Sequence, residues 1–91
     1  MQKRVPLPKD LPGALARAQR EHLAWDPYPC TIEEVTEKTV DVFFTGGTLE
    51  HEVNVRDLER MLAGLRWFKA CRTQAWYPDA LYVTLDREIA F

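Results

Sequence analysis

The feature that most constrains the fold is an alternating segment that runs into two glycines. Residues 40–45 alternate between apolar and more polar positions, and Gly46-Gly47 follows directly. A period of two is typical of a half-buried β-strand, and paired glycines supply the positive φ angles that a tight hairpin turn requires. We therefore predict a β-hairpin in which residues 40–45 pair with residues 48–53.

The register of this hairpin predicts two faces. The core face collects six residues: Val40, Val42, Phe44, Leu49, His51 and Val53. The other face places the ring of Phe43 among acids, and Asp41 lies opposite Glu52. Facing like charges are mildly destabilising unless solvent screens them or a cationic partner neutralises them. We therefore predict a partner-binding face of four residues: Asp41, Phe43, Glu50 and Glu52.

Upstream of the hairpin, the spacing predicts a helix over residues 11–24. Asp10 is placed to cap it, and Pro12 falls in the first turn, where a missing N–H costs nothing. Residues 30–36 then fit a strand if it contains a bulge. The alternative is a short helix capped by Thr31, and we favour the strand.

Downstream of the hairpin, apolar residues recur at helical spacing. A second helix is predicted, capped by Asn54 and ending near Gly64. Residues 66–73 fit a strand or an irregular return, and residues 76–79 indicate a turn. Residues 81–91 alternate around a polar break, which predicts a C-terminal hairpin with Leu85 against Ile89 and Val83 against Phe91.

These elements describe an α+β fold with an N-terminal helix, a three-stranded antiparallel meander, a second helix and a C-terminal β-hairpin. We expect residues 1–91 to form one domain, with residues 1–9 as an extended or flexible arm. Apolar residues make up 46% and charged residues 29% of the 91, which is globular composition. No apolar run reaches membrane-spanning length and the N-terminus lacks a signal peptide, so we expect a cytoplasmic protein with no membrane partner.

The middle of the chain resembles a known architecture. The matching stretches are Trp25, Tyr28-Pro29-Cys30-Thr31-Ile32-Glu33-Glu34-Val35, Thr39-Val40-Asp41-Val42-Phe43-Phe44, Gly46-Gly47, Val53 and Asp57-Leu58. Residues 25–58 resemble the SH3-like small β-barrels of the Tudor and KOW type, and more weakly the bacterial domain of unknown function 2442. The Tudor resemblance implies an aromatic cage for a methylated peptide, built from Trp25, Tyr28 and Phe43. Residues 59–91 have no counterpart in this pattern.

Aromatic residues beside prolines form a second candidate surface. Trp25, Tyr28, Trp76 and Tyr77 lie in segments that we expect to be turns, where side chains are commonly presented to solvent. Tryptophan and tyrosine dominate the energetics of protein interfaces. We predict that these four residues bind a protein partner, with packing into the core as the alternative.

Basic residues concentrate at the N-terminal end. The candidates for nucleic-acid contacts are Lys3, Arg4, Lys9, Arg17 and Arg20. Arg66, Lys69 and Arg72 add a second basic group beside Trp67 and Phe68. The formal net charge is −2, however, and a nucleic-acid-binding domain is typically basic. Nucleic acid therefore stays the alternative partner.

Catalytic and metal motifs are not recognisable in this sequence. Cys30, Cys71, His22 and His51 are scattered singly, whereas structural zinc sites use closely spaced ligand pairs. A Cys–His pair would have to be assembled by the fold, and nothing local supports one. We predict no catalytic residue, no metal and no cofactor.

The sequence thus favours a non-enzymatic protein-binding module. Its small size, its polarised charge and its surplus of aromatics suit a small regulator or inhibitor that occludes a larger partner, as phage and mobile-element proteins often do. A nucleic-acid-associated SH3-like module is the alternative, and a Tudor-like methylated-peptide binder is a further one. The oligomeric state is not predicted.

Overall fold

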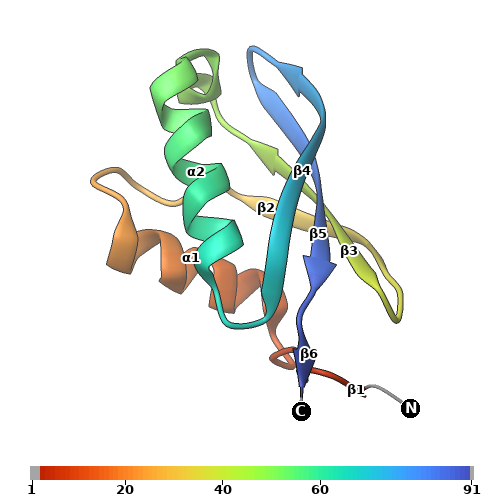
Figure 1. Cartoon of the computed structure of the whole chain (residues 1–91). Coiled ribbons are helices and arrows are strands. Elements are labelled where there is room, and N and C mark those ends of the chain that lie inside the picture. The colour runs from red at the N-terminus through yellow and green to blue at the C-terminus, as the bar shows by residue number, and fades with distance from the viewer. Residues whose placement is uncertain (1–2, 91) are drawn as a thin grey trace.

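A computed structural model describes residues 3–90 and shows an α+β fold (Figure 1). Over these residues it has two α-helices, a short 3-10 helix and six strands. In chain order they are β1 (Lys3–Arg4), α1 (Leu11–His22), β2 (Cys30–Val35), β3 (Thr39–Thr45), η1 (Gly47–Glu50), α2 (Glu52–Gly64), β4 (Phe68–Tyr77), β5 (Ala80–Arg87) and β6 (Ile89–Ala90). The main antiparallel sheet has the order β2-β3-β5-β4, and β1 pairs with β6. The predicted fold class is confirmed.

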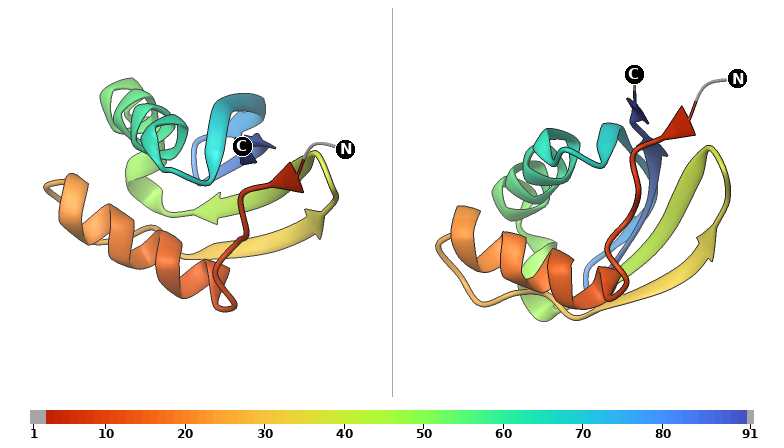
Figure 2. Two further views of the ribbon diagram at one scale, coloured as in Figure 1. Left: turned by 60° about the horizontal axis from the view of Figure 1, so that its bottom comes forward. Right: turned by 90° about the horizontal axis from the view of Figure 1, so that it is seen from below.

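Both α-helices lie on the same side of the curved main sheet (Figure 2). The core fills the space between the two layers, and its central strands contribute six fully buried side chains: Val40, Val42, Phe44, Leu81, Val83 and Leu85. Because side chains alternate along a strand, the residues between these six point to the opposite face. We call that opposite face of the main sheet, which no helix of residues 3–90 covers, the open face.

The first helix begins as the sequence predicts. The Asp10 carboxylate accepts a hydrogen bond from the backbone N–H of Gly13 at 3.1 Å, and Pro12 lies in the first turn. The helix ends at His22, two residues earlier than predicted, because Leu23 adopts an extended conformation. The strand favoured for residues 30–36 is also confirmed as β2, with a bulge between Ile32 and Glu34.

The predicted hairpin across Gly46-Gly47 is wrong. Residues 47–50 form the 3-10 helix η1, α2 begins at Glu52, and the second neighbour of β3 is β5. Leu49 is buried as predicted, but the side chains of His51 and Val53 are exposed. The physical reason is that β5 offers a continuous apolar face to β3, whereas residues 48–53 would have placed a histidine on it.

Two smaller predictions also need correction. The N-cap of α2 is His51, while the Asn54 side chain donates to the carbonyl of Thr48; the end at Gly64 is confirmed. Trp76 and Tyr77 belong to β4, so the turn is confined to Pro78 and Asp79.

The C-terminal segment does not fold back on β5. Ile89–Ala90 instead pair with Lys3–Arg4, so the proposed pairing of Leu85 with Ile89 is wrong, and Phe91 lies outside the described residues. Within the described part of the N-terminal arm, Lys3–Arg4 form the strand β1, and the backbone N–H of Val5 donates to the carbonyl of Glu88 at 2.8 Å. This contact ties the arm to the C-terminal segment.

Candidate functional site

Two aromatic rings lie at the centre of the open face. Phe43 on β3 stands directly opposite Tyr82 on β5, and their ring centroids are 6.5 Å apart. Both side chains are half-buried, since each shields part of the other and the sheet below them. Phe43 was predicted as a partner-binding residue, whereas Tyr82 was missed. The signal was present, because Tyr82 alternates out of phase with its buried neighbours Leu81 and Val83.

Carboxylates lie on one side of this aromatic pair, on β2 and the first half of β3. Asp41 precedes Phe43 by two positions on the same face, and the hydroxyl of Thr84 donates to its Oδ1 at 2.7 Å. Glu34 stands opposite Asp41 on β2, and Glu33 lies in the adjacent bulge. The pKa of Tyr82 is raised above its ordinary value by partial burial, then by Asp41, with smaller effects of Glu33 and Glu34. Part of the rise in the pKa of Tyr82 therefore comes from the negative charges on this part of the face.

The end of the β4–β5 hairpin forms a second aromatic group. Glu50, Trp76, Tyr77 and Pro78 line a shallow hollow there, and the two rings are 44% and 56% exposed. The indole N–H of Trp76 donates to the carbonyl of Leu49 at 2.6 Å, which holds the ring against η1. The structure therefore brings together three residues that the sequence assigned to two separate groups.

The hairpin end is continuous with the open face. Tyr77 pairs with Ala80, two positions before Tyr82, so the side chains of Tyr77 and Tyr82 share that face as diagonal neighbours. We call the combined region the acidic–aromatic surface. Its members on the open face are Glu33, Glu34, Asp41, Phe43, Tyr77 and Tyr82. Glu50 and Trp76 adjoin it at the hairpin end, where Trp76 pairs with the core residue Leu81 and therefore points to the helical side of the sheet.

Glu52 is not part of this surface. It lies in the first turn of α2, where its carboxylate pairs with Arg56 at 2.6 Å. The predicted opposition of Asp41 and Glu52 is therefore wrong, because it depended on a hairpin that does not form. A like-charge pair does occur on the open face, but its second member is Glu34.

The remaining proline-flanked aromatics are not presented as predicted. Tyr28 is 3% exposed and belongs to the core, so the prediction that it faces solvent is wrong. The buried side-chain amide of Gln19 bonds both to the backbone N–H of Tyr28, at 2.7 Å, and to its carbonyl, at 3.2 Å. Trp25 is half-buried beside Tyr28, whereas Phe43 points to the open face. These three rings therefore do not surround a common site.

The predicted basic residues divide between two places. Lys3 and Arg4 lie on β1 and Lys9 lies just before α1. The other two, Arg17 and Arg20, are exposed on α1. The structure does not gather these five side chains into one patch.

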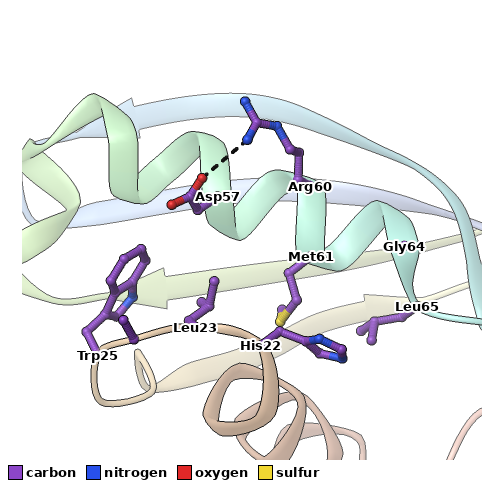
Figure 3. A pocket seen from close by; sticks show the side chains of 9 residues that line it. His22, Leu23, Trp25, Asp57, Arg60, Met61, Gly64 and Leu65 are labelled. Carbon is purple, nitrogen blue, oxygen red and sulfur yellow. Dashed lines mark hydrogen bonds and ion pairs between the residues drawn. The ribbon is translucent and has the colours of Figure 1, made fainter.

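The helical side of the molecule carries two adjacent hollows. The first, of about 560 Å³, lies between the end of α1 and α2 (Figure 3). Its lining is His22, Leu23, Ala24, Trp25, Asp57, Arg60, Met61, Gly64 and Leu65. The second is of equal volume and is lined by Pro6, Leu7, Pro8, Ala14, Arg17, Ala18, Glu21, His22, Leu65, Arg66 and Trp67. Both include His22 and Leu65, so the two hollows adjoin at these residues, and we call them together the inter-helix groove.

The cysteines and histidines do not form a catalytic pair within residues 3–90. Burial, and secondarily Glu59 and Asp86, raises the pKa of the Cys71 thiol to about 12. Burial and then Asp10 raise the pKa of the Cys30 thiol. Both shifts disfavour the thiolate, which is the nucleophilic form. No cluster of three or more His, Cys, Asp or Glu that could hold a metal ion occurs among these residues.

Comparison with known protein families, with curated proteins and with solved structures gives no significant match for this chain. The resemblances to SH3-like barrels and to the domain of unknown function 2442 therefore stay predictions of the sequence. None of the helices in residues 3–90 is long and apolar enough to cross a membrane.

Proposed function

We propose that this chain is a non-enzymatic protein-binding module whose acidic–aromatic surface binds a cationic segment of a larger protein. The observation that carries the proposal is the aromatic pair of Phe43 and Tyr82, with the carboxylates of Glu33, Glu34 and Asp41 on one side of it, on the sheet face that no described helix covers. A module that occupies a basic site on its partner would act as a regulator or inhibitor by occlusion.

The chemistry of the surface suits lysine or arginine side chains. Aromatic faces attract cations, and the attraction is strongest where other groups exclude water. The carboxylates of Glu33, Glu34 and Asp41 would steer a basic segment toward the rings and disfavour an acidic one. Tyr77 extends the contact area on the same face, and Trp76 adjoins it at the hairpin end; both are residue types that dominate interface energetics.

The sheet edges are less suited to binding than this surface. The outer strands β2 and β4 both contain bulges, one in β2 and two in β4. A bulge interrupts the row of backbone groups that an added strand would pair with. The side chains on the open face are therefore better suited to binding a partner than the backbone groups at the sheet edges.

The test is affinity capture of the tagged chain from lysate of its natural host, after nuclease treatment, compared with the variant Glu33→Lys/Glu34→Lys. Both glutamates are exposed, so the variant should fold normally. We expect a stoichiometric protein partner with the wild-type chain and loss of that partner with the variant. Phe43→Ala should reproduce the loss without changing the net charge.

The matched control is Asp26→Lys/Glu37→Lys, which makes the same change in net charge at exposed positions outside the surface. It should retain the partner. Equal retention by both charge variants would refute the acidic–aromatic surface as the binding site. Loss of every partner on nuclease treatment would instead favour a nucleic-acid-associated module.

A further inference from the structure

The inter-helix groove has the shape and lining of a second binding site, on the opposite side of the sheet from the acidic–aromatic surface. Its floor is apolar, with Leu23, Met61 and Leu65 exposed to the first hollow, and the side chains converge on it from α1, the following loop and α2 (Figure 3). The second hollow continues this floor with Leu7 and Trp67. Residues on both sides of the groove also pack against the core, so its walls are fixed.

The charges along the groove differ from those of the open face. Three arginines contribute to its lining, Arg17, Arg60 and Arg66, together with Glu21 and Asp57. The guanidinium of Arg60 points away from the apolar floor (Figure 3). Asp57 is already paired with Arg60 at 3.4 Å. Within residues 3–90, Arg17 and Arg66 have no carboxylate in ion-pair distance.

Two aromatic residues give this lining further features of a binding site. The guanidinium of Arg66 lies 5.9 Å from the ring centroid of Trp67, which holds the charge beside the groove. At the other end, Trp25 lines the first hollow, but its indole N–H is itself buried and has no acceptor among the described residues. An occupant that carries negative charge would complement the exposed guanidinium groups of Arg17 and Arg66.

We propose that the inter-helix groove binds an amphipathic helix of a protein partner, with apolar side chains on the groove floor and carboxylates beside Arg17 and Arg66. Helices commonly bind in grooves through apolar residues at positions i, i+3 or i+4, and i+7. The molecule then has two binding surfaces of opposite charge preference. This site is separate from the proposed acidic–aromatic surface, and either one can be refuted without the other.

The three tryptophans allow a direct test by NMR. Trp25 and Trp67 line the groove, whereas Trp76 lies at the hairpin end, so their three indole N–H signals report on different sites. The probe is a synthetic helical peptide of about four turns with leucines along one face and glutamates beside them. A second peptide carries lysine in place of each glutamate. We expect the acidic peptide to shift the Trp25 and Trp67 signals and leave the Trp76 signal in place.

Charge reversal provides the second arm. Arg17→Glu/Arg66→Glu should weaken binding of the acidic peptide by about tenfold or more, because two exposed attractions become repulsions. Lys38→Glu/Lys69→Glu makes the same net-charge change at exposed positions outside the groove and should have a smaller effect. An unchanged Trp76 signal in each variant shows that the fold is intact.

Several results would overturn this inference. They are equal shifts with the lysine peptide, a shift of Trp76 alone, equal weakening by the two double variants, and no shift at millimolar acidic peptide. A shift of Trp76 alone would place the acidic peptide at the hairpin end, beside the acidic–aromatic surface. The other three results do not bear on that surface, whose test uses other residues.

Discussion

Gln19 is the one polar side chain of α1 that is fully buried, and we predict that it is a principal stabilising residue of this fold. Its amide oxygen accepts from the N–H of Tyr28 at 2.7 Å, and its amide nitrogen donates to the carbonyl of Tyr28 at 3.2 Å. The pair joins the first helix to the loop that leads into β2. Replacement by leucine fills the same space with an apolar side chain of similar size but removes both hydrogen-bond partners of the Tyr28 backbone.

The magnitude follows from the two backbone groups that lose their partners. Tyr28 is 3% exposed, so water cannot readily replace the amide. An unsatisfied buried polar group costs about 1–3 kcal/mol, which gives about 2–6 kcal/mol for the two groups together. Domains of this size have a total stability of about 5–15 kcal/mol, so Gln19→Leu should remove a large share of it.

Urea unfolding followed by tryptophan fluorescence measures this loss of stability. Gln19→Glu supplies a second variant, whose stability should depend on pH. A protonated glutamate can both donate and accept as glutamine does, whereas a buried carboxylate cannot donate. Burial should raise the folded-state pKa of this glutamate above its unfolded value of about 4.3, so stability is retained below that value and lost as pH rises through the folded-state pKa. Gln19→Glu should therefore approach wild-type stability near pH 4 and fall well below it at pH 7. A loss below about 1 kcal/mol for Gln19→Leu, or wild-type stability of Gln19→Glu at pH 7, would refute the reasoning.

Two further predictions concern stability and reactivity. Gly46 has a φ of 154°, and a Cβ there would lie 2.7 Å from the ring of Tyr28, so Gly46→Ala should destabilise the fold by about 1–3 kcal/mol in urea unfolding. Gly47→Ala, where a Cβ meets nothing within 4 Å, should have little effect, and equal losses for the two would contradict the contact argument. The pKa of Cys71 is raised from its ordinary 9.0 to about 12, so its contribution to stability is present below pH 9 and is lost as pH rises toward 12. Cys71→Ala should therefore lose less stability than the wild type between pH 8 and about pH 10.5, and parallel pH profiles would count against that shift.

The parts of the fold that the sequence predicts correctly are those set by local chemistry. Asp10 and Pro12 specify the start of α1, and the irregular alternation around Ile32 indicates the bulge in β2. The error at Gly46-Gly47 has a non-local cause, because β3 pairs with a strand that begins at Ala80. A pattern read along residues 40–53 contains no information about that competing strand.

The candidate site likewise has a part that the local sequence pattern predicts and a part that depends on tertiary contacts. The alternation of β3 correctly separates Asp41 and Phe43 from the core, and this part of the prediction depends only on a period of two. The position of Glu52 and the burial of Tyr28 depend on tertiary contacts, namely the start of α2 and the amide of Gln19. Tyr82 joins the site only through the pairing of β3 with β5.

The most direct test of the central proposal is hydroxyl-radical footprinting of the chain alone and in complex with its captured protein partner. Mass spectrometry then measures the oxidation of each aromatic side chain. Binding through the acidic–aromatic surface predicts strong protection of Phe43, Tyr77 and Tyr82 in the complex. Unchanged oxidation of these three rings in a saturated complex would contradict the proposal.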